Sequence, residues 1–153
     1  MPENKAEELI RSAINRGETS LDLSNLGLVN IPGSVIELKD KLSDLTLGSG
    51  IPGLAGDKIN RVEDLSVLKE FRDLKRLRLQ GLKSLSAACL PELTQLEWLD
   101  ISFTDLTYSD DVAQLSKLKY LNMERCGLTR LHSKNPLPVL KKINFVKWKM
   151  RIF

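Results

Sequence analysis

The sequence predicts an α/β solenoid: a single domain of about six repeats, with a parallel sheet on its concave face and a helix capping its N-terminal end. Three observations lead to this fold class. The chain has 153 residues, the length of one domain. Leucine supplies 29 residues against 8 aromatic ones, which indicates a core built mainly from one aliphatic type. The pattern L-x-x-L-x-L then recurs along most of the chain.

The N-terminal cap is predicted over residues 1–17. Apolar residues at helical spacing form one stripe there, and Gly17 is a suitable end for the helix. A cap is needed because the open end of a stack of repeats exposes its core. The stripe consists of Ala6, Leu9, Ile10, Ala13 and Ile14.

The repeats are predicted over residues 18–153, in the same single domain. The central residues of successive copies are separated by 24, 32, 22, 22 and 22 residues, a regularity that is hard to obtain by accident. In each copy the L-x-L segment alternates with period 2, so its leucines point to one side of a short strand. One repeat cannot bury that side alone, and neighbouring repeats therefore stack. The copies are Leu21-Leu23 (incomplete), Leu42-Leu45-Leu47, Leu74-Leu77-Leu79, Leu96-Leu99-Ile101, Leu118-Leu121-Met123 and Leu140-Ile143-Phe145.

The spacing of 32 contains a Gly-rich insertion at residues 48–58, which we interpret as a mobile loop beside the binding face. Gly48, Gly50 and Gly53 satisfy the letters of a dinucleotide-binding loop. That motif must be followed at once by a helix, and Pro52 and Gly56 interrupt it, so nucleotide binding is not expected. Between the strands, helical spacing predicts helices within Ser34–Leu42, Glu63–Leu74 and Asp110–Leu118.

This pattern resembles the leucine-rich-repeat family, whose unit is L-x-x-L-x-L-x-x-N/C-x-L. The segment Ala6–Ile31, a short helix followed by T-x-L-D-L-S and Ile31-Pro32, looks like the opening of cytosolic bacterial proteins of this family, those of the Roco type included. The resemblance implies recognition of a protein, in bacteria sometimes as a host-directed effector or a regulatory partner. The family has Asn or Cys at the turn after each strand, and of the corresponding residues only Cys126 fits. The others are Leu26, Gly50, Leu82, Thr104 and Trp148. We therefore expect those turns to be satisfied by backbone or water.

The residues between the inward leucines form the concave face, where strands about 4.8 Å apart place Trp98 beside Arg76 and Tyr120. Half of the aromatic residues, Tyr108 among them, fall in two adjacent repeats, and Trp, Tyr and Arg dominate interface hot spots. We predict a module that binds a partner protein, although Trp98 could instead stack on its neighbours only to stiffen the sheet. The predicted contact residues are Arg76, Arg78, Trp98, Asp100, Phe103, Tyr120, Asn122, Glu124, Arg125 and Lys142.

Charge supports an alternative function. Residues 1–73 hold 9 Lys or Arg and 13 Asp or Glu, a net of −4, whereas residues 74–153 hold 14 and 7, a net of +7. A basic half is compatible with binding of nucleic acid or an anionic surface. We favour the protein partner because the lysines are scattered among apolar residues. The cations of the alternative site are Arg76, Arg78, Arg125, Lys142 and Lys147.

Catalysis is not expected, and neither is a cofactor or a metal. His132 is the one histidine and follows Leu131 at a repeat turn, where it is expected to be solvated. Cys89 and Cys126 form no metal-ligand or disulfide pattern, and reduced thiols are typical of a cytoplasmic protein.

The two ends of the chain give two further expectations. Met1 leads into charged residues rather than an apolar signal core, and no apolar run reaches the roughly 18 residues of a membrane span. We expect a cytoplasmic protein, or one delivered into a host cell by a non-classical route. The apolar C-terminal residues are expected to fold over the last repeat, or alternatively to form a homodimer through Trp148, Met150 and Phe153.

Overall fold

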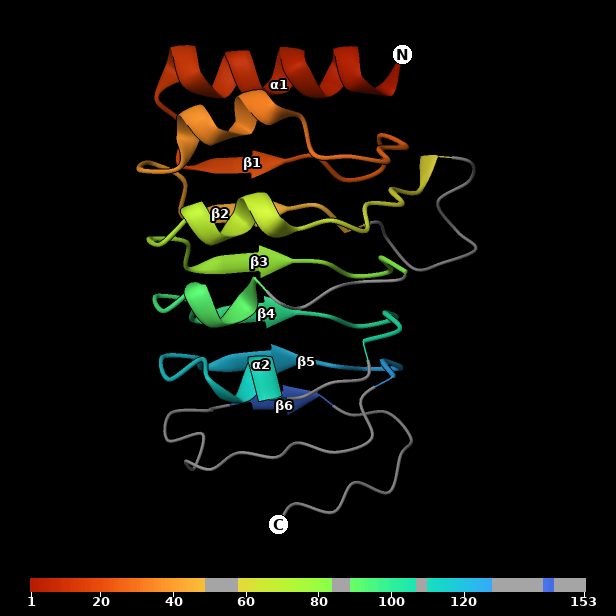
Figure 1. Cartoon of the computed structure of the whole chain (residues 1–153), viewed down its shortest axis with the longest axis vertical. Coiled ribbons are helices and arrows are strands. Elements are labelled where there is room, and N and C mark those ends of the chain that lie inside the picture. Colours follow the sequence, from red (N-terminus) through yellow and green to blue (C-terminus); the bar gives the residue numbers. More distant parts are fainter. Residues whose placement is uncertain (49–57, 84–88, 107–109, 128–141, 145–153) are drawn as a thin grey trace.

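The computed structural model describes residues 1–48, 58–83, 89–106, 110–127 and 142–144 (Figure 1). Helix α1 (Pro2–Arg16) opens the chain, and six short strands then follow in one direction down the stack. The strands are β1 (Ser20–Asp22), β2 (Asp44–Thr46), β3 (Arg76–Arg78), β4 (Trp98–Asp100), β5 (Tyr120–Asn122) and β6 (Lys142–Asn144). The connections contain η1 (Gly33–Leu38), η3 (Ser66–Glu70), η4 (Leu90–Glu92) and α2 (Asp110–Ala113).

All six strands belong to one parallel sheet in chain order, β1-β2-β3-β4-β5-β6. The central residue of each strand pairs with the central residue of the next, so that Leu77 pairs with Leu99 and Leu99 with Leu121. These centres are the ones that the sequence pattern predicts, and the predicted α/β solenoid of six repeats is confirmed.

The leucines of the repeats point to one side of the sheet and form the core. Leu45, Leu77, Leu99 and Leu121 are completely buried, and Leu21 is 4% exposed. Each strand is only three residues long. A single repeat therefore buries little apolar surface by itself, and its stability depends on contact with neighbouring repeats.

Helix α1 covers the β1 end of this core. Ala6, Ile10 and Ala13 are buried, at the helical spacing the sequence predicts, and Leu9 and Ile14 are partly buried against the core. The helix ends at Gly17, which has φ +64°. Its N–H donates to the carbonyl of Ile14, while the N–H of Glu18 donates to Ala13, an arrangement that satisfies the last carbonyls of the helix.

The layer behind the sheet differs from the prediction, because most of its segments are short 3₁₀ turns rather than α-helices. Segment η1 contacts η3, η3 contacts η4, and η4 contacts the four-residue helix α2. Strands advance by about 4.8 Å per repeat, whereas an α-helix with side chains is about 10–12 Å wide. Narrow turns fit that advance better than helices do. The predicted spacing still identifies the inward residues, since Val112, Leu115 and Leu118 are at most 2% exposed.

Asn60 corrects the prediction that the turns lack the family's polar residue. It is 1% exposed and lies after the insertion, 15 residues beyond the strand centre Leu45. Its Oδ1 accepts hydrogen bonds from the backbone N–H groups of Leu26 (3.2 Å) and Leu28 (2.9 Å). Its Nδ2 donates to the carbonyls of Leu23 (2.7 Å) and Leu47 (2.8 Å). The insertion displaces the Asn along the sequence while leaving it at the turn.

Close packing against the next repeat requires a glycine at the first residue of the insertion. Gly48 lies against the backbone of Gln80 on the next repeat, and a Cβ at this position would overlap with the Gln80 backbone. This contact explains the first glycine of the apparent dinucleotide motif; Gly50 and Gly53 lie outside the described residues. Within the described ranges, no helix is both long and apolar enough to cross a membrane.

Candidate interaction face

The side of the sheet opposite the leucines carries the first and third residue of each strand. We call this side the sheet face. Its side chains are exposed or half-buried except for Asp100, while the residue between each pair is buried. The described members are Ser20, Asp22, Asp44, Thr46, Arg76, Arg78, Trp98, Asp100, Tyr120 and Asn122.

Three of the predicted contact residues form a continuous stack across β3, β4 and β5. The rings of Trp98 and Tyr120 are parallel within 4°, with their centroids 4.8 Å apart. The guanidinium carbon of Arg78 lies 4.9 Å from the centroid of the Trp98 ring. The in-register pairing of Trp98 with Tyr120 brings the two rings together. We call Arg78, Trp98 and Tyr120 the face stack.

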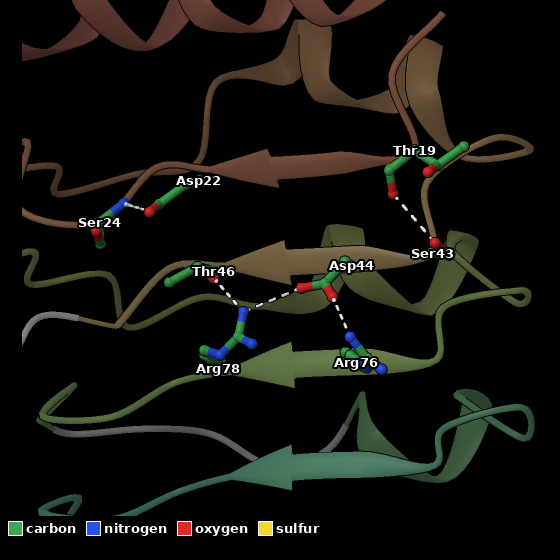
Figure 2. A network of polar contacts seen from close by, with 8 residues as sticks. All are labelled: Thr19, Asp22, Ser24, Ser43, Asp44, Thr46, Arg76 and Arg78. Atoms are coloured by element: carbon green, nitrogen blue, oxygen red, sulfur yellow. Dashed lines mark hydrogen bonds and ion pairs between the residues drawn. The ribbon is translucent and has the colours of Figure 1, made fainter.

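Asp44 holds the cationic end of the face stack in place (Figure 2). One guanidinium nitrogen of Arg78 donates to Asp44 Oδ1 and to Thr46 Oγ1, both at 3.1 Å. The other carboxylate oxygen of Asp44 lies 3.5 Å from Arg76. The Asp44 side chain is 17% exposed, against 60% for Arg76 and 41% for Arg78, so the carboxylate lies beneath two more exposed cations. Asp44 was not among the predicted contact residues, although its charge, opposite to that of its register partner Arg76, is a sequence signal for this ion pair.

Asp100 and Asn122 have a turn-forming role that the sequence prediction did not include. Asp100 is 8% exposed, and its Oδ1 accepts from the backbone N–H of Ser102 (2.9 Å) and from its hydroxyl (2.6 Å). Its Oδ2 accepts from the side-chain amide of Asn122 (3.0 Å), and Asn122 Oδ1 accepts from the N–H of Glu124 (3.3 Å). Both residues therefore fix the turn after their strand. Asp100 was expected to face solvent, but its neighbours cover it.

The turns that follow β1, β3, β4 and β5 each contain a residue with a left-handed backbone. Counting four residues on from the strand centre gives Asn25 (φ +54°), Gly81 (φ +78°), Phe103 (φ +58°) and Arg125 (φ +50°). Asn and Gly adopt this conformation readily, whereas a bulky side chain pays about 1–2 kcal/mol for it. The guanidinium of Arg125 lies over the ring of Phe103, 5.5 Å from its centroid. We call Phe103 and Arg125 the rim pair, because they lie where β4 and β5 end.

The structure thus places the described contact residues in three groups: the face stack with Arg76, the rim pair with Glu124, and the turn-forming pair Asp100 and Asn122. Lys142 lies on β6 in register with Tyr120, but its side chain is outside the described part. Lys147, His132, Tyr108 and the proposed dimer residues Trp148, Met150 and Phe153 also lie outside it.

Two carboxylates with lowered pKa values lie off the sheet face. The hydrogen bond from Lys119 to Glu97 (2.6 Å) lowers the pKa of Glu97, against a smaller opposing effect of desolvation. The pKa of Asp64 is lowered chiefly by the hydrogen bond from the backbone N–H of Ser66 (2.8 Å). Both are local ion-pair or turn contacts. Within the described ranges, His, Cys, Asp and Glu side chains form no group of three that could hold a metal ion.

Comparison with known proteins places this geometry in a fold family. The sequence matches no protein-family model and no curated protein. The structure is similar to the crystal structure of internalin C2 from Listeria monocytogenes, a leucine-rich-repeat protein, with a TM-score of 0.50 and 16% sequence identity. The match covers 91% of this chain and 91% of that one. At this identity the likeness concerns the fold. With its in-register leucine centres and six parallel strands, the chain has the leucine-rich-repeat fold.

Proposed function

We propose that this protein is a non-catalytic module that binds a partner protein on its sheet face, centred on the face stack. The observation that carries the proposal is the stack itself: two parallel aromatic rings and a guanidinium on the solvent side of the sheet. Trp, Tyr and Arg are the residue types that contribute most to binding energy at protein interfaces.

The pre-arranged geometry supports binding. Asp44 and Thr46 restrain Arg78, and stacking restrains Trp98 and Tyr120. Side chains that are already ordered lose less conformational entropy when a partner binds, so more of the contact energy appears as affinity. A face stack that only stiffened the sheet would look the same in the unbound protein. The two roles differ in their effect on binding: removal of the stack lowers the affinity for a partner only if the stack contacts that partner.

The contacts of the arginines on the sheet face support binding of a nucleic acid less well than binding of a protein. Asp44 forms ion pairs with both Arg76 and Arg78. A nucleic-acid interface needs cations placed to contact successive phosphates, and its affinity falls steeply with salt. The dependence of affinity on salt therefore separates the two functions.

The first prediction is that Trp98→Ala weakens partner binding by about 2 kcal/mol or more, roughly 30-fold, while the protein stays folded. The fold should survive because Trp98 is half-buried and the core leucines are untouched. Partners are first recovered by pull-down with the parent protein and with the Trp98→Ala/Tyr120→Ala double variant. Those lost with the double variant are then titrated against purified Trp98→Ala by calorimetry.

Lys69→Ala is the matched control, because Lys69 is exposed on η3, in the layer behind the sheet. It should bind as the parent does. If Trp98→Ala also binds with unchanged affinity, the face stack is not the binding site. A steep loss of affinity with added salt that persists in Trp98→Ala would instead support the nucleic-acid function.

A further inference from the structure

Among the turns that the structure describes, the left-handed position carries costly residues after β4 and β5, the strands of Trp98 and Tyr120. After β1 and β3 it holds Asn25 and Gly81, the types that tolerate a positive φ. After β4 and β5 it holds Phe103 and Arg125. The turn itself forms with Asn or Gly, so its geometry alone does not require a phenyl ring or a guanidinium.

The two costly residues contact each other and belong to the repeats that carry Trp98 and Tyr120. Arg125 Cζ lies over the Phe103 ring, as Arg78 Cζ lies over Trp98. Strained backbone that local structure does not require is found preferentially at functional sites. The coincidence of strain, cation–π contact and the aromatic repeats indicates that the rim pair extends the same binding surface.

The accessible chemistry of the rim pair is that of a carboxylate-binding site. Arg125 is exposed, and within the described ranges no carboxylate forms an ion pair with its guanidinium. The guanidinium carbon lies over the Phe103 ring, and because the Arg125 side chain is exposed, its N–H groups remain accessible to a planar acceptor. By contrast, Lys83, which follows the turn after β3, already forms an ion pair with Asp105 at 3.0 Å.

The charge of the sequence that follows Arg125 favours an acidic partner. Residues 74–127 hold 7 Lys or Arg and 7 Asp or Glu, so the excess of +7 in residues 74–153 comes from residues 128–153, which hold 7 Lys or Arg and no Asp or Glu. Glu124 adds a negative charge next to Arg125, but it is half-buried whereas Arg125 is exposed. An acidic partner segment is therefore attracted toward the basic C-terminal part of the chain, close in sequence to the exposed Arg125.

We propose that the rim pair binds a carboxylate side chain in an acidic segment of the partner protein, while the face stack binds its aromatic or apolar side chains. This inference rests on the proposed function and adds the chemistry of the partner. A protein segment fits the site better than a nucleic acid does, because a single exposed guanidinium over one aromatic ring suits a carboxylate among apolar side chains.

The test measures binding of a labelled short peptide in which Glu alternates with Tyr, against a counterpart with Lys in place of Glu. A short oligothymidylate is the third probe. The acidic peptide should bind at least about tenfold more tightly than the basic one. Arg125→Gln and Phe103→Asn should each reduce that affinity about fivefold or more. Lys83→Gln, which removes a charge already paired with Asp105, should leave it unchanged.

Phe103→Asn also tests whether the strain is dispensable for folding. Asn25 occupies the equivalent turn, so Phe103→Asn should melt at the parent's temperature or above it. A marked fall in Tm would make the ring a structural element and overturn the proposal.

The remaining outcomes separate this inference from the proposed function. Loss of acidic-peptide binding in Trp98→Ala, but not in Arg125→Gln or Phe103→Asn, overturns the rim pair and leaves the face stack as the site. Unchanged binding in all three variants overturns both. Tighter binding of the oligothymidylate, or no detectable binding of the acidic peptide, overturns the inference that the partner is an acidic protein.

Discussion

Replacing Asn60 by alanine is expected to lower the free energy of unfolding by about 3–6 kcal/mol. The Asn60 side chain satisfies four backbone groups that belong to Leu23, Leu26, Leu28 and Leu47. Asn60 is 1% exposed, so in the folded protein bulk water cannot readily take over the hydrogen bonds that its side chain makes. A buried polar group left without a partner costs about 1–3 kcal/mol, and water that enters the vacated space recovers part of the sum.

Urea denaturation followed by circular dichroism measures this change. Asn15→Ala is the control, because Asn15 is exposed on α1, and it should alter stability by no more than about 0.5 kcal/mol. If Asn60→Ala unfolds at the same urea concentration as the parent, Asn60 does not join the first two repeats as described.

Leu99→Ala is expected to cost about 2–5 kcal/mol of stability. Leu99 is the central residue of β4, is completely buried, and pairs in register with Leu77 and Leu121. Its removal leaves a cavity between two repeats, and a stack of repeats derives its stability from such contacts between neighbours. The adjacent residue Trp98 points to the opposite side of the sheet, so the two substitutions separate folding from binding.

Thermal and urea melts of Leu99→Ala should shift strongly, while Val29→Ala should not. Val29 is 57% exposed and provides a matched loss of aliphatic surface outside the core. Identical melts for Leu99→Ala and the parent would mean that the alternation along β4 is displaced by one residue, which would place Trp98 in the core.

The strands and their register could be predicted from the sequence because each repeat applies the same physical rule. Inward apolar residues at period 2 recur in every repeat, at spacings of 24, 32, 22, 22 and 22 residues. They favour the pairing of one strand centre with the next, and all five strand pairs adopt it. The capping helix followed from its apolar stripe and from Gly17 for similarly local reasons.

The features that the sequence analysis missed depend on three-dimensional contacts between distant residues. The spacing between strands limits how wide each segment behind the sheet can be. The helical spacing of apolar residues in the sequence carries no information about this limit. Asn60 bonds to the carbonyls of Leu23 and Leu47, which are 37 and 13 residues away in the sequence, so no local pattern marks its role. The burial of Asp100 depends on Ser102 and Asn122, and the left-handed backbone of Phe103 has no sequence signal in a phenylalanine.

Site-specific photocrosslinking tests most directly whether the sheet face is the recognition surface. A photoreactive amino acid is placed at position 76 on the sheet face, where the Arg76 side chain is 60% exposed, or at position 69 on η3 in the layer behind it. Each protein is irradiated with the partner recovered by the parent. We expect a covalent complex from position 76 and none from position 69. A complex formed from position 69 and not from position 76 would contradict it.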